Sequence, residues 1–251
     1  MSDLRAKIHY LYHSGFAVKT TDHFLVFDYY NDNPCPGKKG LEGGVITEKE
    51  LAANTNTVVF VSHGHGDHYN PVILEWQKEN QNIRYILSSD VPAKGEKIQS
   101  LMPHEKLELS DMSIKTFGST DQGVSFLISV DGLDIFHAGD LNWWHWMDES
   151  SDEEIKLSEK DFLKEMEHII GNRIDIAFFP VDPRLGSGYY LGAERFINLT
   201  KPSMLVPMHF GDNFEAVAAF ALRAQNCNTA VPMIFRRGQS VLFRKSIRDE
   251  A

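Results

Sequence analysis

Cysteine is scarce in this sequence, which contains Cys35 and Cys227 and no others. Two cysteines give no disulfide framework, and neither lies near the histidine-rich segments, so nothing indicates an iron–sulfur or zinc–thiolate site. The sequence also lacks an apolar run long enough to span a bilayer, and no apolar segment precedes the first predicted strand. We therefore expect a cytoplasmic protein that does not interact with membranes.

The sequence is also poor in positive charge: it has 25 Lys and Arg against 35 Asp and Glu, so its net charge is −10. General nucleic-acid binding needs a basic surface, so this balance argues against it. A small anionic substrate is still compatible with the composition, because a bound metal would dominate the local field. The length of 251 residues, 42% of them apolar, predicts one domain over residues 1–251 and leaves a homo-oligomer open.

The segment VVFVSHGHGDHY, residues 58–69, contains the strongest motif in the chain. Its apolar start predicts a short strand buried on both faces, and Asn70 and Pro71 then predict the start of a helix. Between them lies a loop with three imidazoles and one carboxylate, from His63, His65, Asp67 and His68. Gly64 and Gly66 allow the loop to turn tightly, so these side chains can converge. Imidazole and carboxylate together suit a divalent first-row metal.

Two later segments repeat this arrangement of polar residues just past a predicted strand. They are His137-Ala138-Gly139-Asp140 and Pro207-Met208-His209-Phe210-Gly211. In open α/β sheets, ligands collect at such strand ends. Alternating strand and helix patterns support an α/β or α+β fold.

The H-x-H-x-D-H motif resembles the signature of the metallo-β-lactamase superfamily, and the whole chain looks most like the branch that contains L-ascorbate-6-phosphate lactonase. The resemblance implies a four-layer αββα sandwich and one or two divalent ions, zinc or manganese. It places Asp67, His68, Asp140 and His209 at one metal position, with Asp140 able to bridge, and His63 and His65 at the second. It also puts His13 and Asp28 near the metals, whereas His137 is expected to be structural.

The family pattern normally supplies a further histidine to the second metal, but the corresponding stretch here, residues 117–121, contains none. Three explanations stay open. Asp121 substitutes as an oxygen ligand and favours a harder ion such as Mn²⁺. Alternatively, the second position is weak and the enzyme works with one ion. In the third explanation, His145 supplies the missing ligand from the tryptophan-rich segment, residues 141–151.

The implied chemistry is hydrolysis by a metal-activated water, for which Asp67 is the candidate to orient the water or accept its proton. His145 is the candidate to read the substrate or donate a proton. His65 stands where the flavo-diiron members carry an acidic residue, which favours hydrolysis over reduction of O₂ or NO. We expect a small ester, lactone or phosphorylated metabolite as substrate. The alternatives are a phosphodiesterase acting on RNA or a cyclic nucleotide, and a degenerate site that binds metal or metabolite without turnover.

Four expectations concern secondary structure. Residues 7–19 and 24–29 are predicted to be the two strands of an opening hairpin. Residues 47–54 are predicted to be helical, because Thr47 and Glu50 have the spacing of a capping box. A short helix is expected over residues 92–101, and a closing hairpin from residues 233–235 and 241–243.

Overall fold

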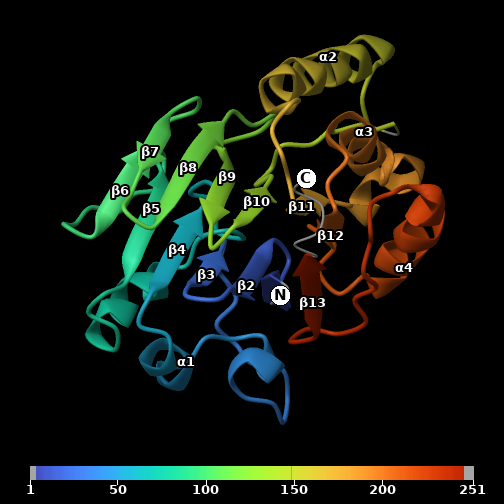
Figure 1. Ribbon diagram of the computed structural model, residues 1–251. Helices are drawn as coiled ribbons and strands as arrows, with labels where there is room; N and C mark the ends of the chain where they lie inside the picture. Colours follow the sequence, from blue (N-terminus) through green and yellow to red (C-terminus); the bar gives the residue numbers. More distant parts are fainter. Residues whose placement is uncertain (1–3, 148, 246–251) are drawn as a thin grey trace.

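The computed structural model describes residues 4–147 and 149–245, and it contains two β-sheets packed face to face with helices outside them (Figure 1). The first sheet has the order β13 (Ser240–Lys245), β1 (Leu4–Tyr12), β2 (Gly15–Lys19), β3 (Phe24–Phe27), β4 (Thr57–Val61), β5 (Arg84–Ser88), β6 (Ile98–Leu101). The second has the order β12 (Met204–Met208), β11 (Ile176–Pro180), β10 (Leu133–His137), β9 (Ser125–Val130), β8 (Met112–Phe117), β7 (Lys106–Glu108). This confirms the predicted αββα architecture.

Helices cover the outer faces of the two sheets. On the first sheet these are α1 (Glu48–Ala53) and the 3₁₀ segment η2 (Pro71–Lys78), whereas α2 (Asp152–Ile169), α3 (Leu191–Thr200) and α4 (Phe214–Arg223) lie on the side of the second (Figure 1). Shorter 3₁₀ turns are η1 (Gly40–Gly43), η3 (Pro183–Gly188) and η4 (Ala224–Asn226). None of the helices in the described residues is long and apolar enough to cross a membrane.

Strand β4 shows how the sheets are buried on both faces. Val58 and Phe60 belong to the core between the sheets, whereas Val59 and Val61 pack in the outer core with Ile73 of η2. Successive side chains of a strand point to opposite faces, so a continuous apolar run is what a strand covered on both sides requires. The predicted buried strand at this position is confirmed.

Parallel pairing directs several strand ends toward one edge. In the first sheet β3 and β4 pair in parallel, and in the second β10, β11 and β12 do. The carboxyl ends of parallel strands share an edge, so the loops that follow these strands meet there. The histidine-rich loop follows β4, and the His137–Asp140 and Pro207–Gly211 segments contain the ends of β10 and β12.

The expected helix after residue 47 is confirmed as α1, where the Glu50 carboxylate accepts a hydrogen bond from the Thr47 N–H at 3.0 Å. The single strand expected over residues 7–19 is wrong: it is divided into β1 and β2 by a turn at His13, which has a φ of 54°. Period-2 patterning continues through such a tight turn, so the pattern did not reveal the break.

Two further expectations are wrong. Residues 98–101 form β6, which pairs in parallel with β5, instead of the end of a helix. Residues 233–235 form no strand; residues 241–243 lie in β13, whose partner is β1 at the start of the chain. The partner of β13 is distant in sequence, whereas β6 pairs with the preceding strand, β5; local propensity identifies neither pairing.

Candidate metal centre

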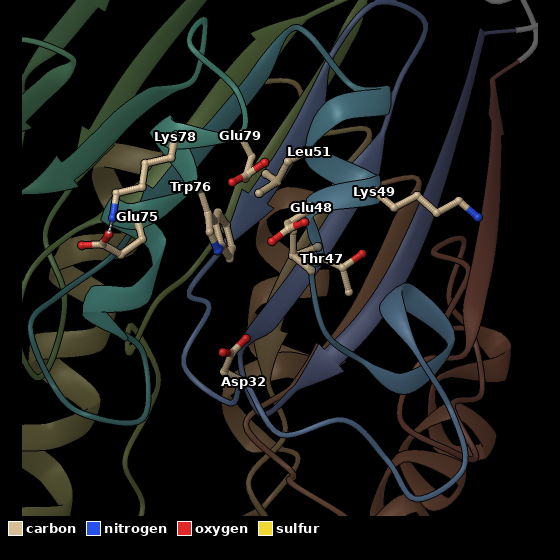
Figure 2. Close-up of a pocket in the computed structure, with 10 residues that line it drawn as sticks. Asp32, Thr47, Glu48, Lys49, Leu51, Glu75, Trp76, Lys78 and Glu79 are labelled. Atoms are coloured by element: carbon tan, nitrogen blue, oxygen red, sulfur yellow. Dashed lines mark hydrogen bonds and ion pairs between the residues drawn. The ribbon is translucent and has the colours of Figure 1, made fainter.

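Two hollows in the described surface are candidates for the site. The larger, about 570 Å³, lies beside α1 and η2 and is lined by Asp32, Thr47, Glu48, Lys49, Trp76 and their neighbours (Figure 2). Its lining contains no histidine or cysteine. The second, about 440 Å³, is lined by His65, Asp67, Thr120, Asp121, Asp140, Trp144, Trp146, Arg184 and His209. Most of the groups with metal or acid–base chemistry lie here, so the smaller hollow is the candidate site.

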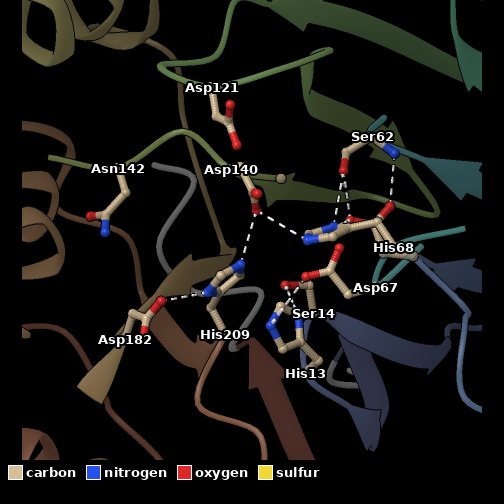
Figure 3. Close-up of polar contacts among 12 residues, drawn as sticks. His13, Ser14, Ser62, Asp67, His68, Asp121, Asp140, Asn142, Asp182 and His209 are labelled. Atoms are coloured by element: carbon tan, nitrogen blue, oxygen red, sulfur yellow. Dashed lines mark hydrogen bonds and ion pairs between the residues drawn. The ribbon is translucent and has the colours of Figure 1, made fainter. Parts of the chain in front are cut away.

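The predicted ligands from three distant segments come together at this hollow (Figure 3). In each of four overlapping groups, the ligating atoms lie within 4.8 Å of one another. The groups are His13, Asp67, His68, His209; His63, His65, Asp67; His63, His68, Asp140; and His65, Asp121, Asp140. His13 therefore lies among the ligating atoms themselves, nearer than the supporting position expected for it.

The donor atoms fit a divalent ion. The Nε2 atoms of His63, His68 and His209 and Oδ1 of Asp140 are buried, and none has a hydrogen-bond partner among the described residues. Asp140 Oδ1 lies 3.2 Å from His68 Nε2 and 3.3 Å from His209 Nε2, without hydrogen-bond geometry. Buried polar atoms are normally satisfied, and one or two cations held among these residues would satisfy all four atoms.

The charges at the cluster also favour a cation. Burial alone would lower the pKa of His68, but the carboxylates of Asp140 and Asp28 outweigh it and raise the pKa to about 10. They therefore stabilise a positive charge at this position, and a bound metal ion would supply that charge in place of the proton on His68. Burial would raise the pKa of Asp140, but His68 and His209 hold it well below its usual value, so the carboxylate stays ionised. Burial and the neighbouring His209 and His68 lower the pKa of His13 to about 2, which leaves its imidazole neutral and able to ligate.

Two carboxylates behind the cluster orient the imidazoles. Asp28 Oδ2 lies 2.7 Å from His68 Nδ1, and its two oxygens accept hydrogen bonds of 2.7 Å from the N–H and hydroxyl of Ser62. Asp182 Oδ2 lies 2.8 Å from His209 Nδ1. In each case the second ring nitrogen, Nε2, is left to face Asp140. This arrangement, in which a carboxylate holds a histidine that points at a common centre, is typical of metal sites.

His137 is placed outside all four groups. Its side chain is fully buried, its Nε2 lies 2.9 Å from the carbonyl oxygen of Ser14, and its ring stacks on Phe27 at 5.0 Å. It therefore packs beneath the cluster and holds the turn that contains His13.

Three of the six non-glycine residues with a positive φ in the described chain lie at the cluster. His13, Asp28 and His209 have φ values of 54°, 41° and 67°, in the left-handed region that non-glycine residues rarely adopt. The two histidine turns hold each other, because the His209 N–H donates to the His13 carbonyl oxygen at 3.2 Å. Strained residues persist only where surrounding structure fixes them, and they gather at functional sites.

Asp121 is the residue predicted as a substitute for the histidine that the family pattern supplies to the second metal. It follows β8 on an exposed loop, and its carboxylate is grouped with His65 and Asp140. Figure 3 shows the Asp121 carboxylate pointing toward Asp140. The structure thus brings an oxygen donor to the side of the cluster where the family pattern normally has an imidazole.

His145 is not brought to the cluster. In residues 143–146 alternate rings point to opposite sides: Trp144 and Trp146 line the hollow, whereas the His145 ring lies against Trp143 at 5.4 Å and against Gly188. The alternation of side chains along residues 143–146 therefore turns this imidazole away from the metal ligands. Neither the third explanation for the missing histidine nor a proton-donating role receives support from this geometry.

Asp182 and Arg184 were missed by the sequence analysis. Asp182 comes two residues after β11, as Asp140 comes three residues after β10, so its place past a buried strand was the available signal. Arg184 donates to the Asp182 carboxylate from Nε at 2.9 Å and 3.0 Å, and its Nη2 lies 3.3 Å from His209 Nδ1.

This geometry can be compared with known proteins. Residues 7–209, which contain every ligand in the four groups, match the family described as the beta-lactamase superfamily domain. The chain belongs to the beta-lactamase superfamily. Membership accounts for the two-sheet architecture and for the position of the histidine-rich loop after β4.

Relatives of this superfamily member include proteins named metal-dependent hydrolases. One from Opitutus terrae is 24% identical over 231 residues, 82% of this chain and 86% of that protein. Another, from Archaeoglobus fulgidus, is 23% identical over 266 residues, 95% of this chain and 100% of that protein.

Two solved structures show the same fold. A metallo hydrolase from Ignicoccus hospitalis has a TM-score of 0.64 and 20% identity, covering 95% of this chain and 98% of that one. CmlA, a diiron β-hydroxylase from Streptomyces venezuelae, has a TM-score of 0.62 and 12% identity, covering 95% of this chain and 54% of that one. The superfamily fold thus occurs in proteins of different chemistry, and the reaction has to be argued from the site.

Proposed function

We propose that this protein is a metal-dependent hydrolase that uses a metal-activated water to cleave a small ester, lactone or phosphorylated metabolite. The observation that carries the proposal is the convergence of three buried imidazole nitrogens and one carboxylate oxygen beside an open hollow, all without hydrogen-bond partners in the part of the chain that the structure describes. The relatives named metal-dependent hydrolases support it. A divalent ion in such a position activates water and polarises a carbonyl or phosphoryl oxygen.

The residues around the ion would have separate roles in the reaction. Asp67 lines the hollow and its side chain is 49% exposed, so it can orient the attacking water and accept its proton. Asp28 and Asp182 keep the rings of His68 and His209 in one tautomer and orientation. Asp140 lies between the imidazoles of the two halves of the cluster and can bridge two ions.

The size of the hollow supports a small substrate. About 440 Å³ is within the range for small-molecule sites, and the resemblance to the lactonase branch points to a lactone or a phosphorylated compound. A phosphodiesterase remains an outcome of the same experiment. Purified protein is treated with EDTA, reloaded with Zn²⁺ or Mn²⁺, and assayed on 4-nitrophenyl esters, δ-lactones and bis(4-nitrophenyl) phosphate. Turnover of the first two classes is expected, whereas phosphodiester cleavage alone would favour the alternative, and no turnover with any metal would contradict hydrolysis.

For the second metal position we propose that Asp121 replaces the absent histidine. Asp121 is grouped with His65 and Asp140, and His63 is grouped with His65 in a second, overlapping set. Together these four residues would offer two nitrogen and two carboxylate donors, a set richer in oxygen that suits Mn²⁺ better than an all-histidine set does. In D121A the number of bound metal ions should fall from two to one, and D121H should shift the preference toward Zn²⁺. Elemental analysis and calorimetric titration measure both without turnover.

Asp161 provides the control for this experiment, because it is an exposed carboxylate on α2 that is in none of the ligand groups. D161A removes the same charge and should bind metal like the wild type. If D121A keeps the wild-type stoichiometry and metal preference, Asp121 is not a ligand.

A further inference from the structure

One wall of the hollow is formed by a cation and two aromatic rings that take no part in the ligand groups. These are Arg184, Trp144 and Trp146. Of the described residues that line this hollow, Arg184 is the only Lys or Arg, whereas Asp67, Asp121 and Asp140 line it as carboxylates. All three carboxylates can face metal ions, so Arg184 is the lining charge that remains for another partner.

The guanidinium of Arg184 is fixed in place. Its Nε and Nη2 donate to the carboxylate of Asp182, which is buried, and its Cζ lies 5.8 Å from the centre of the Trp146 ring. Because Asp182 also holds His209, the position of the guanidinium is tied to the position of a proposed metal ligand. A cation held this way loses little conformational freedom when it binds an anion.

One edge of this guanidinium is free. Among the described residues Nη1 donates no hydrogen bond, and the Arg184 side chain is 58% exposed toward the hollow. Arginine is suited to recognising carboxylate and phosphate groups through paired N–H donors. Holding Asp182 uses only the Nε and Nη2 side, so that structural role does not explain the free edge.

The tryptophans define the rest of the wall. Trp144 is anchored by a hydrogen bond of 3.1 Å from its Nε1 to the Asp140 carbonyl oxygen, and its ring lies 5.4 Å from the His209 ring. The rings of Trp144 and Trp146 are nearly parallel, at 10°. They present an apolar surface beside His209 and Arg184, over which the carbon skeleton of a substrate can lie.

We propose that Arg184 and the two tryptophans form a subsite that binds an anionic group of the substrate, a carboxylate or a phosphate, beside the metal centre. The proposal rests on the proposed function, since it names the substrate class of the same site. The substrate would carry its scissile bond at the metal ligands and an anionic group at the Nη1 edge, with the intervening carbon atoms against the tryptophan rings. Substrates without the anionic group would bind more weakly.

A binding experiment tests the subsite without turnover. Metal-loaded protein is titrated calorimetrically with butyrate and with succinate, glutarate and adipate. A monocarboxylate can engage only the metal or the arginine, whereas a dicarboxylate of suitable length engages both. At least one dicarboxylate should bind roughly tenfold to hundredfold more tightly than butyrate, the range expected for one charge-assisted hydrogen-bonded contact. R184M should abolish this advantage.

The variants are chosen so that loss of metal is not mistaken for loss of the subsite. R184Q removes the charge but keeps an amide that can donate to Asp182, and both variants are checked for bound metal before titration. R195M makes the same substitution at an exposed arginine of α3 and should keep the wild-type advantage. No dicarboxylate advantage in the wild type, or an advantage that persists in metal-loaded R184M and R184Q, would overturn the proposal.

Kinetic assays then distinguish a carboxylate from a phosphate. The pairs are 4-nitrophenyl butyrate with mono-4-nitrophenyl glutarate, and δ-gluconolactone with its 6-phosphate. R184M should reduce kcat/KM for the anionic member roughly tenfold to hundredfold more than for the neutral one, in the pair whose anion the subsite binds. If no substrate is turned over while the dicarboxylate advantage depends on Arg184, the proposed hydrolysis fails and the anion subsite stands.

Discussion

The contact between Asp28 and His68 gives the sharpest quantitative prediction. Asp28 is fully buried and accepts from Ser62 N, Ser62 Oγ and His68 Nδ1, each at 2.7 Å. Burial opposes ionisation of Asp28, but the neighbouring His137 and His68 lower its pKa to about 2. Asp28 is therefore a carboxylate at neutral pH. D28N would place a neutral amide against the same three donors.

Loss of a carboxylate that supports a metal-ligating histidine typically costs tenfold to a hundredfold in metal affinity, or about 1.4 to 2.7 kcal/mol. We expect D28N to weaken Zn²⁺ binding at pH 7 by this factor. At saturating Zn²⁺ the metal-induced gain in unfolding free energy should fall by the same amount. The metal-free variant should lose about 1 to 3 kcal/mol on its own, because buried donors are left poorly matched.

Competition with a chelating dye measures the Zn²⁺ affinity, and urea unfolding with and without Zn²⁺ separates the two free energies. D131N is the matched control, because Asp131 holds His23 through a similar contact of 3.0 Å and His23 is in none of the ligand groups. It should lower stability and leave Zn²⁺ affinity unchanged. If D28N binds Zn²⁺ within threefold of wild type, Asp28 does not orient a metal ligand and the reasoning fails.

Three other substitutions test the fold around the site. G123A should lower the unfolding free energy in urea by roughly 2 kcal/mol or more, because φ is 71° and a Cβ would lie 2.0 Å from the Ser62 carbonyl oxygen; G66A, with nothing within 4 Å, should be close to neutral. Burial and the nearby Lys7 lower the pKa of His9 to about 4, so its contribution to stability is present above pH 6.5 and is lost as the pH falls from 6.5 toward 4. H9Q should therefore reduce the stability difference between pH 7 and pH 5 by roughly 1 to 2 kcal/mol, and an unchanged difference would contradict this assignment. F178A should cost about 3 to 5 kcal/mol in the same unfolding assay, because Phe178 is fully buried against Phe16 and Phe27 between the sheets; a loss below 1 kcal/mol would contradict tight packing there.

The sequence was most informative where chemistry and local structure coincide. The loop with His63 and His68 lies within six residues, directly after an apolar strand, so its convergence could be predicted from spacing and glycine content. The αββα fold and the participation of Asp140 and His209 were predicted only through resemblance to a family. Nothing local connects residues 140 and 209 to residue 68, because the contact depends on how the two sheets pack.

The remaining features depend on directions and partners that no local pattern encodes. His145 has the chemistry of a catalytic residue, but its ring lies against Trp143 and Gly188 instead of the metal ligands. Asp182 and Arg184 have no motif around them. Their contacts with His209 depend on the path of the chain after β11, which no local pattern predicts. Strand β13 finds its partner at the opposite end of the chain.

The division of the ligands between the two sheets has a mechanical consequence. The histidine-rich loop and His13 extend from strands of the first sheet, whereas Asp140 and His209 extend from the second. A bound ion would therefore cross-link the sandwich at one edge, and separating its halves would require breaking coordination bonds. Metal affinity and the stability of the sandwich are therefore coupled. A substitution deep between the sheets can weaken metal binding without touching a ligand. Removal of the metal by a chelator should accelerate amide hydrogen exchange in both sheets at once.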